Sequence, residues 1–236
     1  MSLGDARRLI NAHLHRMHLG HGTLCLHAVA LRCPGDCGTV VLLGGHGAGK
    51  TLVAIALAEQ GWWPVAGDLV LLDVGHVPAF RGGTSAFLAR SDALRRWFPN
   101  MPAGSSHEEK VDLRSQWDDG GGDDLGRTAP LLAAVLVDVD GDPRAHTAGL
   151  GLADGHTAAT AWLRASTHVL DRILDSSSTV LRLVESADGA HHRVALIRRL
   201  ARHVPLHMAW GAPQRIAAQV DQLTRAVPIP SGGAAW

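Results

Sequence analysis

The sequence predicts an α/β fold, and three neighbouring segments carry the prediction. Residues 39–43 are apolar and mostly β-branched or aliphatic, which is typical of a buried strand in a parallel sheet. After a glycine-rich turn, residues 51–60 place apolar side chains at helical spacing and end at Gly61. A second apolar run at 69–73 predicts another strand. The order strand, loop, helix, strand therefore indicates a βαβ unit.

The turn between the first strand and the helix matches the phosphate-binding pattern G-x-x-x-x-G-K-[ST]. It reads Gly44, Gly45, His46, Gly47, Ala48, Gly49, Lys50 and Thr51. Glycines without a Cβ let backbone N–H groups curl around phosphates, and the following helix points its N-terminus at the same spot. Lys50 predicts a mobile charge for the β- and γ-phosphates, and Thr51 an oxygen ligand for Mg²⁺. We expect these eight residues to bind ATP with Mg²⁺, the alternative being a turn that binds nothing.

Composition sets Lys50 apart from the other basic residues. The chain has 22 lysines and arginines together, and only Lys50 and Lys110 are lysines. Arginine is thus the usual cation of this chain, but its guanidinium is a rigid planar fork, whereas the ammonium group of lysine is a compact point charge. A lysine at position 50 therefore favours a phosphate-binding role.

Length, charge and cysteine content exclude several classes of protein. A chain of 236 residues with 46% apolar content can bury a core, and we expect a single domain over residues 1–236. The formal net charge is zero, which favours no nucleic-acid partner, and the apolar runs are too short for a membrane span. The first residues lack the apolar stretch of a signal peptide, and three cysteines are sparse for a secreted scaffold. We expect a cytoplasmic protein.

The remaining elements follow from periodicity. Residues 1–20 predict an amphipathic helix, with Leu9, Ile10, Leu14 and Met17 on its apolar side. Strands are expected at 23–31, 77–80, 84–89, 131–138 and 204–210, and helices at 91–98, 158–174, 191–201 and 214–225. Residues 105–127 are polar, with an acidic glycine run at 118–124, and predict a flexible loop. A lid or a metal-binding loop is the alternative there.

Three segments resemble the HPr kinase/phosphorylase superfamily, whose phosphate loop is shared with phosphoenolpyruvate carboxykinases. They are residues 26–31 (LHAVAL), the strand and loop at 38–51, and residues 61–68 (GWWPVAGD). The C-terminal end, from residue 204, is also similar to small kinase-like relatives, some of which accompany peptide natural-product biosynthesis. The resemblance implies a P-loop nucleotide-binding domain of the HPr kinase and phosphoenolpyruvate carboxykinase type.

The resemblance also implies roles for individual residues. It places His27 at the strand histidine of the family and Asp68 at the second position of an acidic pair, and it makes Lys50, His27 and Asp68 the expected catalytic residues. Asp68 would hold Mg²⁺ with Thr51, and Asp68 or His27 would accept the proton of an acceptor hydroxyl. The family's first acidic position is Gly67 in this chain. The alternatives are that Asp68 is only a turn residue and that His27 is one of fifteen histidines without a special role.

The sequence thus predicts an ATP- and Mg²⁺-dependent kinase that phosphorylates a hydroxyl. The favoured acceptor is a serine or threonine of a peptide or small protein, and the alternative acceptor is a small molecule. A regulatory NTPase without phosphotransfer is the other alternative, since Gly67 removes one carboxylate. An ATPase acting on DNA is disfavoured by the neutral charge. Relatives in the family often form homo-oligomers.

Other polar clusters have weaker signals. Arg81, between glycines and a predicted strand, is interpreted as a solvated loop residue, with a phosphate or acidic substrate contact as the alternative. A zinc site of Cys25, Cys33, Cys37 and His27 is an alternative, because a hairpin turn would bring Cys33 and Cys37 together, but the C-x₂-C spacing of such sites is absent. His13, His15, His18 and His21 have no regular spacing and are predicted to lie on the surface.

Overall fold

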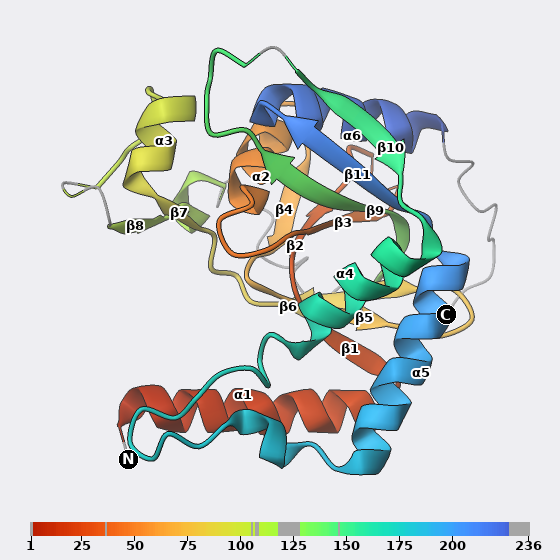
Figure 1. The fold of residues 1–236 in the computed structure, drawn as a ribbon. Helices are drawn as coiled ribbons and strands as arrows, with labels where there is room; N and C mark the ends of the chain where they lie inside the picture. Colours follow the sequence, from red (N-terminus) through yellow and green to blue (C-terminus); the bar gives the residue numbers. More distant parts are fainter. Residues whose placement is uncertain are drawn as a thin grey trace.

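The fold is a mixed sheet with helices on both faces, shown in a computed structural model (Figure 1). The structure describes residues 2–35, 37–104, 106, 109–117, 128–145 and 147–226. The strands are β1 (Thr23–His27), β2 (Val29–Arg32), β3 (Thr39–Leu43), β4 (Trp63–Ala66), β5 (Leu69–Asp73), β6 (Ala79–Gly83), β7 (Leu88–Arg90), β8 (Lys110–Asp112), β9 (Ala129–Val139), β10 (Gly149–Leu152) and β11 (Leu206–Gly211). The helices are α1 (Leu3–Gly20), α2 (Lys50–Ala58), α3 (Ser91–Trp97), α4 (Gly155–Thr167), α5 (Ala187–His203) and α6 (Pro213–Ala226), with short 3₁₀ turns η1 (Arg114–Gln116) and η3 (Leu181–Val184).

The long strand β9 organises the sheet. It pairs in parallel with β3 on one side and with β11 on the other, and its first residues pair with β6. The order β1-β5-β6-β9-β3-β2-β4 runs through it, with β10 outside β11. Because β3, β9 and β11 are parallel, their carboxyl ends lie at one edge of the sheet, where the turn after β3 begins.

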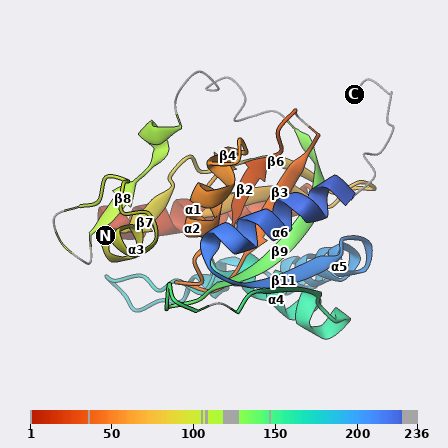
Figure 2. The ribbon, with the colours of Figure 1, turned by 90° about the horizontal axis from the view of Figure 1, so that it is seen from above.

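The strand β3 is buried on both faces, as its continuous apolar run predicts. Val40 and Leu42 belong to the core cluster that includes residues of α2 and α6, whereas Val41 and Leu43 belong to the cluster that includes residues of α4 and α5. Figure 2 looks down on α6, which contacts β9 and β11. A small projection of α3, β7 and β8 lies beside α2 (Figure 1). The mixed α/β architecture is therefore a sheet between two helical layers.

The predicted βαβ unit is wrong in its last strand. Residues 69–73 do form β5, but β5 pairs antiparallel with β1 and β6, far from β3. The strand that follows α2 is β4, which the sequence did not identify, and it is separated from β3 by β2. The predicted strand at 23–31 is likewise divided into β1 and β2. Each half joins different partners, so the chain changes its course at Ala28.

Several other boundaries differ from the prediction. Arg81, interpreted as a loop residue, lies inside β6 together with Gly82 and Gly83, and residues 84–87 are not strand. The predicted helix at 158–174 ends at residue 167, while α5 is longer than the predicted 191–201. Part of the predicted loop at 105–127 forms β8 and η1, and the acidic run at 118–124 lies outside the described residues. None of the helices in the described ranges combines the length and the apolar character that a membrane span requires.

Helix α1 turns a different side to the protein than its apolar pattern predicts. Ile10, Leu14 and Met17 are exposed, and the buried residues are Asp5, Ala12, His15 and Leu19. Asp5 accepts hydrogen bonds from the backbone N–H groups of Asp175 (2.8 Å) and Ser176 (3.0 Å). The Asp5 carboxylate therefore binds α1 to the segment that follows α4. A hydrophobic pattern does not report such a contact.

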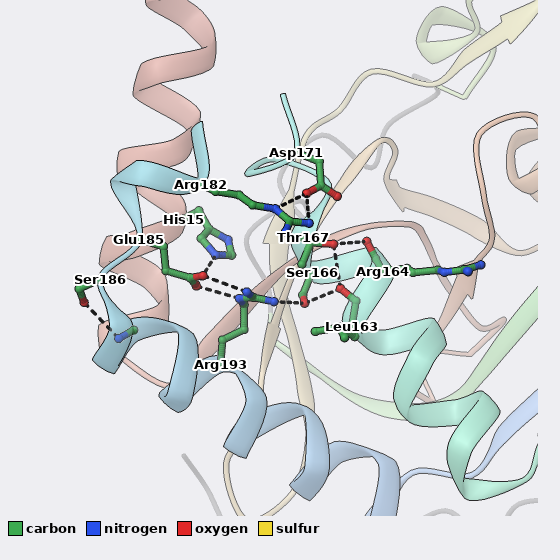
Figure 3. Close-up of polar contacts among 11 residues, drawn as sticks. His15, Leu163, Arg164, Ser166, Thr167, Asp171, Arg182, Glu185, Ser186 and Arg193 are labelled. Atoms are coloured by element: carbon green, nitrogen blue, oxygen red, sulfur yellow. Dashed lines mark hydrogen bonds and ion pairs between the residues drawn. The ribbon is translucent and has the colours of Figure 1, made fainter. Parts of the chain in front are cut away.

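His15, predicted to lie on the surface, is buried beside an ion pair (Figure 3). Glu185 accepts two hydrogen bonds from Arg193, at 2.8 and 2.9 Å, and Arg193 also donates to Ser166. His15 Nε2 lies 4.0 Å from Glu185 Oε1, and neither ring nitrogen has a hydrogen-bond partner among the described residues. Burial lowers the pKa of His15 to about 4, so the ring is neutral in the folded protein at pH 7.

This buried histidine predicts a loss of stability in mild acid. The unfolded chain protonates His15 near its ordinary pKa of 6.5, while the folded protein resists protonation down to about pH 4. The free energy of unfolding should therefore fall as the pH drops from about 6.5 to 4, by up to about 3 kcal/mol from this group. Urea denaturation of the wild type and of His15→Gln at pH 7 and pH 5 measures the difference. Equal pH slopes for the two proteins would contradict the assignment.

Candidate active site

The glycine loop, residues 44–51, joins the carboxyl end of β3 to α2. Gly47 and Gly49 have φ values of 85° and 87°, a left-handed conformation that a side chain disfavours. A Cβ on Gly49 would overlap the Val139 side chain, and the Val139 N–H donates to the Ala48 carbonyl (3.0 Å). The end of β9 therefore holds the loop closely from one side, and only glycine fits at position 49.

The first turn of α2 has no side-chain cap. Its N-cap residue is Gly49, whereas α1, α4 and α5 begin with Ser2, Asp154 and Ser186, whose side chains accept a backbone N–H. The first N–H groups of a helix have no partner within the helix, and the helix dipole makes this end positive. A helix start without a capping side chain leaves these groups to an anion.

Lys50 is buried and folded back on the loop. Its ammonium group donates to the carbonyl oxygens of Gly44 (2.9 Å) and Gly45 (3.1 Å) and contacts His27 Nε2 at 3.1 Å. Burial lowers the pKa of Lys50 to about 8, partly opposed by the charge of Asp68. The charged amine is thus already inside the loop and desolvated. An anion bound at the loop would offset the cost of burying this charge.

His27 and Asp68 lie together next to Lys50. His27 Nδ1 is 3.1 Å from the backbone oxygen of Asp68 and 3.2 Å from its carboxylate Oδ1. Because both partners are acceptors, Nδ1 carries the proton, and Nε2 is left as the acceptor that faces Lys50. The hydrogen bond from His27 lowers the pKa of Asp68 to about 2. The three side chains form a continuous chain of contacts, referred to below as the Asp68–His27–Lys50 relay.

Strand pairing is what brings the relay together. His27 ends β1 and pairs with Leu69 at the start of β5, which puts Asp68 beside His27 although they are 41 residues apart. Asp68 has φ 68°, in the left-handed region that non-glycine residues rarely adopt. Such conformations cluster at functional sites, where the surrounding structure holds them in place.

Two of the cavities formed by the described residues open beside the glycine loop, and His27 and His46 line both. The first, the β7 cavity, has a volume of about 240 Å³. It is lined by residues 46–52 of the loop and α2, by Asp68 and by the end of β7. Arg90, Lys110 and Arg172 add positive charge to its wall. A cavity with this excess of cations around a helix start suits a polyphosphate.

The second cavity lies on the other side of the loop, against α4, and has a volume of about 400 Å³. We call it the α4 cavity. Its walls come from Gly44 and Gly45, from His27, and from α4 residues that include His156, Thr160 and Arg164. The ring of His168, just after α4, stacks on His27 with centroids 3.9 Å apart. Burial and the neighbouring His27 lower the pKa of His168 to about 4.

The two residues predicted to hold Mg²⁺ both lie at the β7 cavity. Thr51 and Asp68 both line it, and Thr51 Oγ1 donates to the Leu88 carbonyl (3.2 Å), which leaves its lone pairs available. The described residues contain no group of three or more His, Cys, Asp or Glu that would hold a metal alone. Mg²⁺ usually takes one or two protein oxygens together with phosphates and water, so this pair fits a metal that arrives with a nucleotide.

Gly67 is closed to any side chain. Its N–H donates to the Thr84 carbonyl (2.8 Å), its carbonyl accepts from Thr84 Oγ1, and a Cβ would overlap the Ala86 carbonyl oxygen. A carboxylate side chain therefore has no room at position 67 in this fold. Asp68 is the acidic residue that lines the β7 cavity beside it.

An aspartate at position 67 should destabilise the protein. We expect Gly67→Asp to lower the free energy of unfolding by about 3 kcal/mol, because the side chain meets backbone rather than a movable group. Nucleotide turnover should not rise. Chemical denaturation, followed by an ADP-release assay on the folded fraction, measures both. A stable variant with higher turnover would show that the corner opens to admit a second carboxylate.

Other residues named from the sequence lie elsewhere. Arg81 is exposed and bonds Asp73 (2.6 Å) and Thr128, so it belongs to neither cavity. Cys33 and Cys37 are joined as a disulfide, and Cys25 is buried in β1, where burial raises its thiol pKa to about 12. The zinc alternative therefore has no support in their placement.

Sequence reasoning missed several residues that line the two cavities. They are Arg90, Lys110, Arg164, His168 and Arg172. They stand in segments without any motif, and the long sequence separations give no sign that they meet the loop. The scarcity of lysine was the one available signal, since Lys50 and Lys110, the only two lysines in the chain, both line the β7 cavity.

Known proteins resemble this chain in structure rather than in sequence. No protein-family model and no curated protein sequence matches the chain. A solved structure of the Hpr(Ser) kinase/phosphatase from Coxiella burnetii superposes with a TM-score of 0.37 at 10% sequence identity, over 85% of this chain and 93% of that one. Two chains this far apart need not share a function.

Proposed function

We propose that the protein is a kinase that transfers the γ-phosphate of ATP to a hydroxyl group. The observation that carries the proposal is the Asp68–His27–Lys50 relay, which ends at the glycine loop between two cavities. A loop that only bound nucleotide would need Lys50 but not an oriented histidine whose acceptor nitrogen faces that lysine. The relay supplies both a phosphate-binding charge and a proton acceptor in one place.

The glycine loop and Lys50 would hold the phosphates. Phosphoryl transfer asks for positioning and charge neutralisation more than for covalent chemistry by the protein. The N–H groups at the start of α2 and the cations of the β7 cavity supply that charge. When Lys50 turns from the Gly44 and Gly45 carbonyls to the phosphates, it also releases His27 Nε2.

His27 would then act as the base, held by Asp68. The acceptor oxygen bonds to the γ-phosphorus, the bond from that phosphorus to the β–γ bridging oxygen breaks, ADP leaves, and the hydroxyl proton passes to His27 Nε2. Asp68 is a poor base itself, with its pKa near 2, but its charge fixes the His27 tautomer and stabilises the imidazolium. Thr51 and Asp68 are the groups that would hold Mg²⁺, which neutralises phosphate charge when it is bound.

The acceptor is expected from the family resemblance to be a serine or threonine of a peptide or small protein. The α4 cavity favours a second candidate, a small-molecule hydroxyl, because its volume of about 400 Å³ is in the range of small-molecule pockets. In either case the acceptor would enter from the α4 side, since the start of α2 and most of the cations around the loop line the β7 cavity.

The test follows the label from γ-labelled ATP. The protein is incubated with Mg²⁺, labelled ATP and a cell extract, in parallel with Asp68→Asn, which tolerates the left-handed conformation. Label on a discrete metabolite, peptide or protein, lost in the variant, would establish the kinase. Label released only as inorganic phosphate would contradict transfer and support the alternative of a nucleotide-binding NTPase.

A further inference from the structure

We infer that the α4 cavity binds the acceptor and that Arg164 recognises an anionic group on it, so that the acceptor is a small hydroxy compound carrying a carboxylate or a phosphate. The inference rests on the proposed function and adds the chemical class of the substrate. Its basis is an arginine in the wall of the α4 cavity that no carboxylate of the described residues neutralises.

The arginines around α4 differ in how they are used. Arg193 is bound to Glu185, Arg182 is bound to Asp171, and Arg172 contacts His168. The guanidinium of Arg164 forms no hydrogen bond or ion pair with the part of the chain that the structure describes. Figure 3 shows the Arg164 side chain extending away from the cluster around Glu185 and Arg193. Its planar fork matches the two oxygens of a carboxylate or phosphate.

The electrostatic surroundings also favour an anion. The groups that line the α4 cavity besides Arg164 are histidines, threonines and apolar side chains, with no aspartate or glutamate among them. Thr157 and Thr160 add hydroxyl groups on the same side of α4 as Arg164. Arg164 is exposed to solvent, and an anionic acceptor would pair with its guanidinium, whereas a neutral acceptor would not.

Arg164 and His27 line the same cavity, so one small acceptor could contact both side chains. His27 lines the α4 cavity together with the first glycines of the loop. An acceptor whose anionic end is held by Arg164 can present its hydroxyl to His27 Nε2 and to the phosphates. An acceptor whose anionic group and hydroxyl lie close together fits the size of the cavity. This argues for a small molecule rather than a folded protein partner.

The experiment measures ADP release and product formation with defined probes. Glycerate, L-serine and glycerol 3-phosphate offer a hydroxyl beside an anion, and glycerol is the neutral control. At least one charged probe should raise ADP release tenfold or more over glycerol, with a new phosphate ester seen by ³¹P NMR. Arg164→Ala should lower kcat/KM for that probe at least tenfold, mainly through KM, and Arg164→Lys should recover part of it. The KM for ATP should stay unchanged.

Arg198→Ala is the matched control, because Arg198 is an exposed arginine on α5 that lines neither cavity. It should behave as the wild type. Equal activity with glycerol, an Arg164→Ala variant as active as the wild type, or activity with a serine peptide alone would each overturn the inference. ATP hydrolysis without stimulation by any charged probe would overturn it too, but would leave nucleotide use intact. Absence of ATP binding and hydrolysis would instead defeat the proposed function.

Discussion

Replacing Lys50 by methionine should weaken nucleotide binding at least about 100-fold, since each hydrogen bond from a charged group contributes about 1.5–3 kcal/mol. Methionine keeps the length and the apolar contacts of the lysine stem but removes the charge that the loop holds beside His27. Titration of ATP, with and without Mg²⁺, by isothermal calorimetry measures the change.

The same variant should fold as well as the wild type. Burial already makes the charged amine of Lys50 unfavourable, as its lowered pKa of about 8 indicates, so a neutral side chain is compatible with the site. Lys50→Arg is the informative comparison. It retains the charge, but the guanidinium fork is bulkier than the ammonium group, and we expect it to bind ATP nearly as poorly as methionine. Wild-type affinity in either variant would exclude a phosphate-binding role for Lys50.

Removing the imidazole of His27 should slow phosphoryl transfer by about 10²- to 10⁴-fold, the range typical of a positioned acid or base. In His27→Asn the nucleotide affinity should change by less than about tenfold, because Lys50 and the loop amides remain. Quenched-flow measurement of product formation separates transfer from binding. A variant with unchanged transfer would show that His27 is only a packed histidine.

Asp68→Asn should act through His27 rather than add to its loss. The carboxylate holds the His27 tautomer with Nε2 as the acceptor, so the double variant should be little slower than His27→Asn alone. Effects that multiply in the double variant would instead show that Asp68 contributes chiefly by holding Mg²⁺ with Thr51, and not by orienting His27.

The local parts of the fold could be predicted from the sequence. The strand at 39–43, the helix after the glycine loop and most later helices appear where periodicity places them, because an apolar run or a 3.6-residue repeat needs only its own neighbours. The pairing of strands could not be predicted in this way. Residues 69–73 read as a strand, but nothing in their pattern distinguishes β1 from β3 as the partner.

The burial of polar residues was the second feature that the sequence did not predict. His15 and Asp5 look like surface residues in the sequence, and they are buried because Glu185, Arg193 and the backbone after α4 provide their surroundings. Ile10 and Met17 look like core residues and are exposed, because the face of α1 that docks carries Asp5, His15, Ala12 and Leu19. Periodicity reports hydrophobicity alone, so it does not find a docking face that includes an aspartate and a histidine.

The sequence by itself determined the chemistry of the glycine loop, since conformational freedom of glycine, a point charge and a hydroxyl are properties of the residues at fixed spacing. Only the tertiary structure decided what surrounds the loop. The antiparallel register of β1 and β5 sets Asp68 against His27, and the docking of α4 brings Arg164 and His168 to the same place. The physical reason is that these contacts join segments far apart in the chain, whose meeting depends on the packing of the whole sheet.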